Sequence, residues 1–220
     1  IDQTWGQVLE YSGKLCDARF SKCCGGVMEE FSACWGDEEH PYLRALPDAP
    51  GHSADQTPFC AKADEETLAQ VLNSYDRETV DFYRWTVDYG RDEVSELISR
   101  KGGVDLGRLI SVEVLERGLS GRIVKLKAVG SLRTLILGKE LEIRRLLSES
   151  HLKSSAFEVS YLGPDGKEMS SSDDWATLRI EGKGWGHGVG LCQIGAAVMA
   201  SEGYGYKEIL EHYYPGSSLV

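Results

Sequence analysis

The sequence predicts an α+β fold with a mostly antiparallel β core, a few helices and a smaller inserted α/β subdomain. Three short segments at 110–117, 122–128 and 133–137 alternate apolar and polar residues between turns that contain glycine. This pattern predicts an antiparallel meander. Apolar residues at helical spacing predict an amphipathic helix at 92–100, and Pro215-Gly216 end a second predicted helix at 206–213.

The first sixty residues are predicted to form short strands and turns. Residues 6–11 alternate as a strand, and residues 17–21 form a second strand that runs into Cys23-Cys24-Gly25-Gly26. Two successive glycines after a strand permit positive φ and close approach of another backbone. Several prolines and a glycine in residues 47–63 predict a surface loop.

The rest of the chain alternates between helical and extended patterns. The predicted elements are a helix at 65–72, strands at 82–89, 157–161 and 176–181, a helix or turn at 139–147, and a helix at 191–200. Gly102-Gly103 is expected to end the helix at 92–100. We predict a core domain made of residues 1–63 and 149–220, with residues 64–148 as the inserted subdomain.

Composition narrows the class of ligand. The formal net charge is −11, which argues against nucleic acid, because a phosphate backbone is bound by clustered Lys and Arg. The charge is compatible with a neutral sugar polymer; the alternative is that acidity only maintains solubility. No apolar run approaches the roughly 20 residues that span a bilayer. The first residues lack the features of a signal peptide, so the N-terminus does not define the compartment.

Five of the six cysteines fall in the first 60 residues: Cys16, Cys23, Cys24, Cys34 and Cys60. This clustering is typical of a disulfide or a metal site in an exported protein, and free thiols are the third alternative. The spacing is not the paired C-x-x-C pattern of zinc sites. Because Cys23 and Cys24 are adjacent, we expect a disulfide from one of them to Cys34 or Cys60.

A glycine-rich junction between a strand and a helix is the most informative segment. Residues 182–190 contain five glycines, which would weaken the interior of a strand or helix. Either a ligand approaches the main chain closely, or the loop turns tightly into the following helix. The segment is not a nucleotide loop, because Val189 stands where the third glycine of G-x-G-x-x-G belongs.

Three side chains of this junction suit a polyhydroxylated ligand. His187 lies between two glycines, Trp185 precedes it, and Gln193 is expected in the first turn of the next helix, where it can donate and accept hydrogen bonds. The free N–H groups of that helix point back at the loop and favour a neutral imidazole. The alternative is that His187 bonds only a local carbonyl and Trp185 belongs to the core.

The same segment carries a resemblance to a known family. Gly184-Trp-Gly-His-Gly-Val-Gly-Leu-Cys-Gln-Ile-Gly-Ala196 and His212-Tyr-Tyr-Pro-Gly216 resemble the C-terminal signature of the stage II sporulation protein D/LytB (amidase enhancer) family. Upstream, Cys24-Gly25-Gly26, Trp35-Gly36 and Ser120-Gly121-Arg122 are similar to its earlier segments, so the resemblance spans nearly the whole chain. The cysteine-rich form resembles Bacteroidetes-type homologues.

The resemblance implies processing of peptidoglycan glycan strands. Family members are similar to lytic transglycosylases, whereas others are described as amidase enhancers; the alternative is therefore a non-catalytic glycan-binding or amidase-enhancing module. It implies an exported protein of the periplasm or cell envelope, with glycan strands and a cell-wall amidase as partners. His187 and Gln193 would support catalysis. The expected substrate-binding residues are Gly25, Gly26, Glu29, Gly184, Trp185, Gly186, Gly188 and Tyr213.

The sequence departs from the family pattern in three respects. The segment that carries the family's catalytic glutamate is absent from these 220 residues, so we expect no glycan cleavage by this chain alone. The His/Cys segment that holds zinc in some relatives is also absent, so we expect no metal or other cofactor here and assign zinc only to the missing N-terminal half. Cysteines replace the usual serines at positions 23, 24 and 192.

Overall fold

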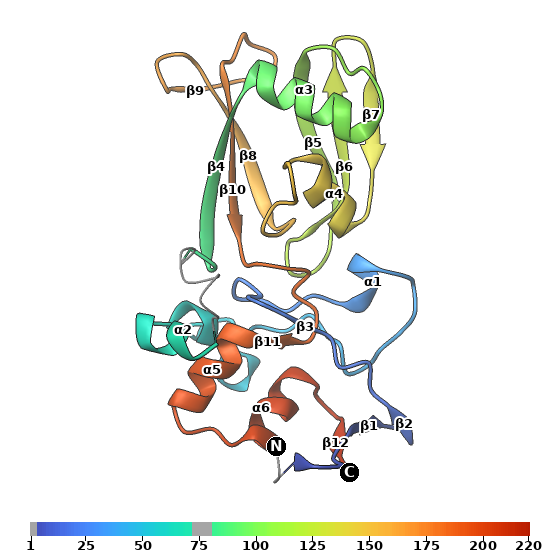
Figure 1. Ribbon diagram of the computed structural model, residues 1–220, viewed down its shortest axis with the longest axis vertical. Helices are drawn as coiled ribbons and strands as arrows, with labels where there is room; N and C mark the ends of the chain where they lie inside the picture. The colour runs from blue at the N-terminus through green and yellow to red at the C-terminus, as the bar shows by residue number, and fades with distance from the viewer. Residues whose placement is uncertain (1–3, 72–80) are drawn as a thin grey trace.

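The computed structural model describes residues 4–71 and 81–220, which form two units stacked along the long axis of the molecule (Figure 1). Each unit has its own hydrophobic core. Trp175, Ile123 and Leu126 lie in the core of the upper unit, and Met28 and Phe59 lie in that of the lower unit. The mixture of helices with mostly antiparallel strands confirms the predicted α+β class.

The upper unit consists of two antiparallel sheets and two helices. One sheet has the order β4-β10-β8-β9 and the other the order β5-β6-β7. The elements are β4 (Arg84–Gly90), α3 (Arg91–Gly102), β5 (Leu109–Arg117), β6 (Ile123–Gly130), β7 (Thr134–Leu137), α4 (Glu140–Leu146), β8 (Phe157–Leu162), β9 (Glu168–Met169) and β10 (Thr177–Lys183). Helix α3 contacts β4, β5 and β10, and α4 contacts β6, so the helices bridge the two sheets.

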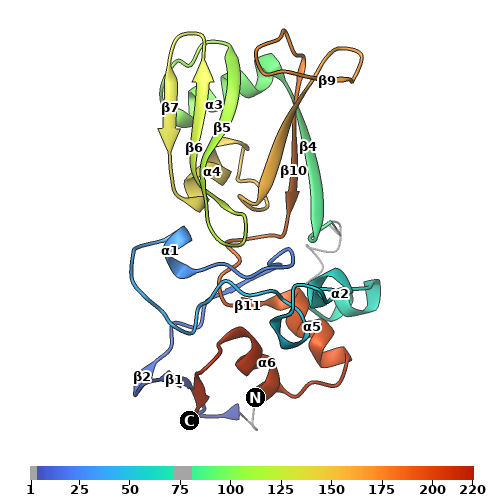
Figure 2. The ribbon, with the colours of Figure 1, turned by 180° about the vertical axis from the view of Figure 1, so that it is seen from behind.

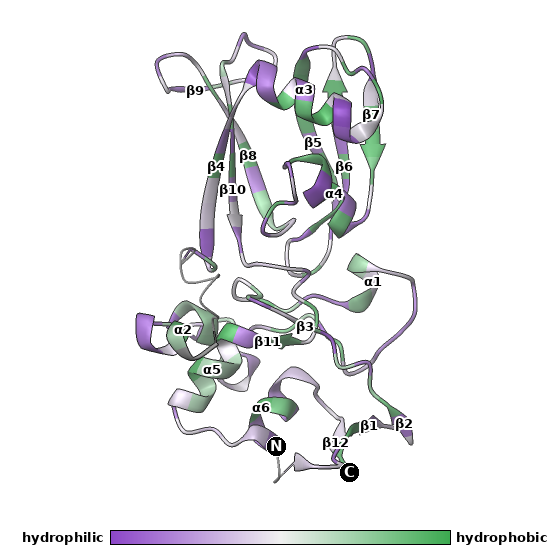
Figure 3. Cartoon of the chain, viewed as in Figure 1, coloured by the Kyte–Doolittle hydropathy of each residue, from purple (hydrophilic) through white to green (hydrophobic). Residues whose placement is uncertain are grey.

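In the upper unit, the structure contains the strands and helices that the sequence patterns predicted. β5, β6 and β7 pair antiparallel in succession, which confirms the meander. Gly103 has a φ of 66°, a left-handed conformation that glycine adopts without steric cost, and it caps α3 where the sequence predicted the end of the helix. Figure 3 shows α3 with alternating hydrophilic and hydrophobic residues and α5 as mostly hydrophobic.

The predicted domain boundaries differ from the observed ones. Residues 149–183 were assigned to the core domain, but β8 and β10 pair with each other and β10 pairs with β4. The upper unit therefore runs from β4 to the end of β10, beyond the insertion of residues 64–148 that the sequence predicted. The paired residues of β4 and β10 are 87 to 99 positions apart in the chain, so this pairing has no local sequence signal.

The lower unit contains little regular structure and is held together by loops and short pairings. Its elements are β1 (Leu9–Tyr11), β2 (Lys14–Leu15), β3 (Phe20–Ser21), α1 (Phe31–Cys34), the 3-10 helices η2 (Pro50–His52) and η3 (Phe59–Ala61), α2 (Glu65–Val71), β11 (Leu191–Cys192), α5 (Gln193–Ser201), α6 (Tyr206–Tyr213) and β12 (Ser218–Leu219). β1 pairs with β12, so the two ends of the described chain meet (Figure 2).

The glycine-rich loop connects the two units. After β10 the chain descends into the lower unit, where β11 pairs in parallel with β3 and leads directly into α5 (Figure 1). The loop at 184–190 thus lies at the junction, with the segment after β3 on one side and the β5–β6 turn near it. Within the described residues, no helix is both long and apolar enough to cross a membrane.

Candidate functional site

The glycines of the loop are required by contacts with the protein's own backbone. Cys23 and Trp185 exchange both main-chain hydrogen bonds, at 3.0 and 2.8 Å. A Cβ on Gly184 would lie 2.7 Å from the carbonyl oxygen of Cys23, and one on Gly25 would lie 2.8 Å from the Gly184 nitrogen. These contacts match neither of the two explanations that the sequence left open, a ligand at the main chain or a tight turn into the helix, because the loop packs against residues 23–25 of the same chain.

Arg122 joins the loop to the rest of the site. Its side chain is fully buried, and its guanidinium donates to the carbonyls of Cys24 at 3.1 Å and Gly186 at 3.3 Å. It also donates to the Ser120 hydroxyl at 2.9 Å. Gly188 makes room for this group, because a Cβ there would lie 2.3 Å from the guanidinium carbon. One buried cation therefore ties the upper unit to two loops of the lower unit.

Glu29, which was predicted to bind substrate, is fully buried and already bonded by the protein. Its Oε2 accepts from the backbone N–H and hydroxyl of Ser120, at 3.2 and 2.7 Å, and its Oε1 accepts from the N–H of Glu30. The backbone N–H of Glu29 donates to the carbonyl of Gly188 at 2.9 Å. These contacts make Glu29 part of the support for the loop.

His187 is partly buried and its ring is neutral near neutral pH. Burial, followed by the positive charges of Arg122, Arg144 and Arg19, lowers the pKa of His187 to about 4. Nδ1 accepts a hydrogen bond from the N–H of Val189 at 3.0 Å, which fixes the ring. The low pKa agrees with the neutral imidazole expected from the sequence, although burial and the guanidinium groups are the main cause.

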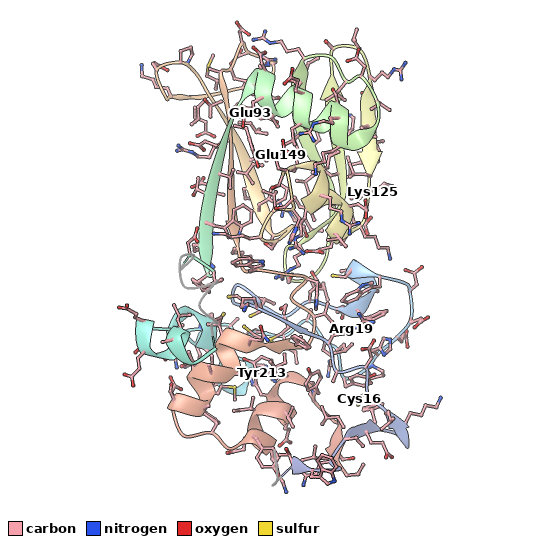
Figure 4. The ribbon with its side chains drawn as sticks, viewed as in Figure 1. Cys16, Arg19, Glu93, Lys125, Glu149 and Tyr213 are labelled. Atoms are coloured by element: carbon pink, nitrogen blue, oxygen red, sulfur yellow. The ribbon has the colours of Figure 1, made fainter. Side chains whose placement is uncertain are left out.

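An aromatic group connects His187 to the surface. The edge of the Trp35 ring lies against His187 with centroids 4.8 Å apart, Phe31 follows at 4.9 Å from Trp35, and His40 lies 4.3 Å from Phe31. The Arg19 guanidinium lies over Trp35 at 4.4 Å. Figure 4 labels Arg19 at this level, in the lower unit below α1.

Two clefts adjoin the aromatic group on either side of α1. Phe31 and His40 line a cleft of about 700 Å³, and Glu29 and Lys139 line another of about 440 Å³ that reaches the β5–β6 turn. The two clefts share Glu30, Ser32 and Asp37. This arrangement can hold an elongated polar ligand across the junction of the two units, with carboxylates and aromatic rings along its path.

Among the residues that the structure describes, three others that the sequence predicted for the site, Trp185, Gln193 and Tyr213, make no ring contact or hydrogen bond with the His187 ring. Trp185 stacks on Phe82 with centroids 5.1 Å apart and packs against the lower core. Gln193 is partly buried in the first turn of α5. Tyr213 is buried in the lower unit, where its hydroxyl donates to Asp48 at 2.7 Å (Figure 4).

Sequence reasoning missed Trp35, Phe31 and the central role of Arg122. Trp35-Gly36 and Ser120-Gly121-Arg122 had been noted for their resemblance to the family, but nothing in their spacing predicted contact with the loop. The expected disulfide is also absent. All six cysteines are free thiols, and the sulfurs of Cys24 and Cys60 lie 3.6 Å apart, well beyond the length of a disulfide bond.

Comparison with known proteins identifies the family. A family model described as "Domain of unknown function (DUF8618)" matches residues 29–190, from two residues before α1 to the end of the loop. Over the whole length of this chain, the sequence is 26% identical to the amidase enhancer of Bacillus subtilis. It is 25% identical to the stage II sporulation protein D of Bacillus amyloliquefaciens over 98% of the chain, and 24% identical to that of Bacillus subtilis over all of it. The chain belongs to the DUF8618 family, and over its whole length it is similar to the stage II sporulation protein D/LytB family.

The matches cover only part of those relatives. The chain spans 32% of the length of the amidase enhancer and 48–49% of the two stage II sporulation proteins D. The amidase enhancer and the stage II sporulation protein D of Bacillus subtilis match the whole chain, so the segments that carry the site, residues 24–40, 120–122 and 184–193, fall inside both matched regions.

Proposed function

We propose that this chain is the glycan-holding part of a cell-wall protein that cleaves peptidoglycan strands as a lytic transglycosylase when intact. The observation that carries the proposal is the neutral imidazole of His187, held on the glycine-rich loop against Trp35, which in turn contacts Phe31, a residue that lines a cleft. The whole-length similarity to proteins named amidase enhancer and stage II sporulation protein D supports it.

The cleft chemistry suits an uncharged sugar chain better than an anionic polymer. Glu30, Asp37 and their acidic neighbours line the larger cleft, and carboxylates accept hydrogen bonds from sugar hydroxyls. Phe31 offers an apolar ring to the C–H face of a sugar. With a formal net charge of −11, the chain would repel nucleic acid.

The catalytic step requires one carboxylic acid, which we assign to a segment outside these 220 residues. The acid protonates the glycosidic oxygen, the 6-hydroxyl of the same muramyl sugar attacks its anomeric carbon, and the resulting carboxylate takes the hydroxyl proton. The products are a 1,6-anhydro sugar and a free sugar end, so no water is consumed. Because Nδ1 of neutral His187 already accepts from the N–H of Val189, the ring carries its proton on Nε2 and would act as a donor to the acid or to a sugar hydroxyl.

The proposal also places the protein in the cell envelope, outside the cytoplasm, with glycan strands as its main partner. The alternative function is amidase enhancement without cleavage, which the similarity to the amidase enhancer of Bacillus subtilis favours. In that case the chain would bind glycan and stimulate a cell-wall amidase.

Cleavage of denuded glycan strands distinguishes these functions. The 220-residue chain and a longer form with the preceding part of the protein are incubated with strands stripped of stem peptides, and 1,6-anhydromuramyl products are measured by mass spectrometry. We expect products only from the longer form. A longer form that binds strands, forms no anhydro product and accelerates an amidase would instead support the alternative.

A further inference from the structure

Four buried groups from distant parts of the chain converge in the lower unit. They are the thiols of Cys24, Cys60 and Cys192 and the carboxylate of Asp48, and their ligand atoms all lie within 4.8 Å of one another. None of the four residues is more than 2% exposed. We call this group the thiol cluster. It lies apart from His187, and neither the proposed glycan cleft nor the family comparison assigns it a role.

The spacing of these atoms matches the edges of a tetrahedral zinc site. With zinc–sulfur bonds of about 2.3 Å, two sulfur ligands of a tetrahedron lie about 3.8 Å apart, and a sulfur and an oxygen about 3.6 Å apart. The Cys24 and Cys60 sulfurs are 3.6 Å apart, and the Cys24 sulfur is 3.3 Å from Asp48 Oδ2. Only small side-chain adjustments would bring all four atoms into coordination.

The surrounding backbone is arranged to stabilise thiolate, the form of cysteine that binds metal. Cys192 caps the N-terminus of the nine-residue helix α5, and its sulfur accepts from the N–H groups of Gly195 at 3.3 Å and Cys24 at 3.2 Å. The Cys24 sulfur accepts from the N–H of Gly26 at 3.4 Å.

Asp48 is held in place by its own partners. Its Oδ1 accepts from the Tyr213 hydroxyl at 2.7 Å, and its Oδ2 accepts from the N–H of Cys60 at 3.3 Å. A Cβ on Gly195 would lie 2.3 Å from the Tyr213 hydroxyl and 2.6 Å from Asp48, so the small residue in α5 admits this pair. Hydrogen bonds of this kind orient metal ligands in known sites.

We propose that Cys24, Asp48, Cys60 and Cys192 bind one Zn²⁺ ion in a structural site. Three thiolates and one carboxylate fill a tetrahedron and leave no open position, as in structural rather than catalytic zinc sites. The ion neutralises a buried carboxylate and thiolates that would otherwise be costly to ionise. It also cross-links four segments that no long helix or sheet joins in the lower unit.

The fourth ligand is the most specific part of this proposal. The Cys23 thiol interacts with those of Cys192 and Cys60, so it adjoins the thiol cluster and is an alternative to Asp48. We assign Asp48 because its carboxylate is within 4.8 Å of all three other ligand atoms. Cys16 and Cys34 lie outside the thiol cluster and provide matched controls.

Metal analysis of the chain tests the site independently of any glycan activity. The reduced, metal-free chain is titrated with Zn²⁺ alone and with Co²⁺ alone, and bound metal is counted by mass spectrometry of the metal and of the intact protein. We expect one ion per chain, and with Co²⁺ intense sulfur-to-metal charge-transfer absorption and the visible bands of tetrahedral coordination. Chelation should lower the melting temperature, and added Zn²⁺ should restore it.

Single substitutions then test the ligand set. Cys24→Ser, Cys60→Ser, Cys192→Ser and Asp48→Asn should each weaken Zn²⁺ binding at least tenfold, whereas Cys16→Ser, Cys34→Ser and Cys23→Ser should retain it. If a ligand variant does not fold, the cobalt spectrum and chelator response of the unchanged chain still decide. Absence of Zn²⁺ and Co²⁺ binding, or a Cys24–Cys60 disulfide in the isolated protein, would overturn the proposal. Loss of zinc in Cys23→Ser with retention in Asp48→Asn would overturn the assigned fourth ligand.

Discussion

Substitution of Arg122 by methionine tests whether one buried guanidinium holds the site together. The change keeps most of the aliphatic volume and removes the hydrogen bonds to the carbonyls of Cys24 and Gly186 and to Ser120. Ser120 in turn donates to the buried carboxylate of Glu29. The variant therefore leaves two buried carbonyls without this donor and a buried carboxylate without the neighbouring cation.

The expected loss of stability is large for a single substitution. Hydrogen bonds from a charged donor contribute about 1.5–3 kcal/mol each, and removing one member of a buried charged network costs about 3–5 kcal/mol. Because these contributions overlap, we expect a decrease of about 4 kcal/mol in the free energy of unfolding. For a chain of this size that corresponds to a melting temperature lower by roughly 8–16 °C.

Thermal and urea unfolding followed by circular dichroism measure this loss. Arg179→Met is the matched control, because Arg179 pairs with Asp88 on the exposed surface of β10, at 2.9 and 2.7 Å. Exposed pairs contribute little, so this control should unfold close to the wild-type temperature. If Arg122→Met unfolds within 2 °C of Arg179→Met, the guanidinium does not hold the loops, and the account of the site is wrong.

Three further substitutions test separate parts of the structure. The pKa of His187 is about 4 in the folded protein and about 6.5 when unfolded, so the unfolded chain binds more protons between these values. The contribution of His187 to the free energy of unfolding should be complete above about pH 6.5 and should fall by about 3 kcal/mol toward pH 4. The His187→Gln variant should lack this pH dependence. An unchanged slope in that variant would contradict the low pKa. Gly188→Ala should destabilise by about 1–3 kcal/mol more than Gly203→Ala, because both have positive φ but only the first meets Arg122; equal melting temperatures would exclude that clash. Tyr213→Phe should lower the free energy of unfolding by about 1–3 kcal/mol, because the hydrogen bond to Asp48 is lost. Tyr206→Phe, at an exposed position, should leave the free energy of unfolding in urea nearly unchanged.

Local sequence signals predicted most of the individual elements. α6 spans Tyr206–Tyr213, the range expected before the stop at Pro215-Gly216, and Gly103 ends α3 because glycine adopts its φ without strain. The meander of β5, β6 and β7 followed from alternation and glycine turns, which act between neighbours in the chain. The fold class could therefore be predicted from short-range patterns.

Contacts between distant segments could not be predicted in the same way. β10 pairs with both β4 and β8, so the upper unit extends beyond the predicted boundary. The thiol cluster gathers residues 24, 48, 60 and 192, whose separations match no short metal motif. Tyr213 illustrates the same limit, because its place in the motif pointed to the substrate, whereas the fold turns its hydroxyl toward Asp48.

Binding of the chain to denuded glycan strands tests the central claim most directly. The 220-residue chain is sedimented with insoluble strands stripped of stem peptides, and the bound fraction is measured for wild type, His187→Ala and His151→Ala. His151 is an exposed histidine of the upper unit, outside both clefts, so it controls for removal of an imidazole. The account predicts that wild type and His151→Ala bind, and that His187→Ala, folded with a similar melting temperature, binds at least several-fold more weakly. Equal binding by all three, or no binding by the wild type, would contradict it.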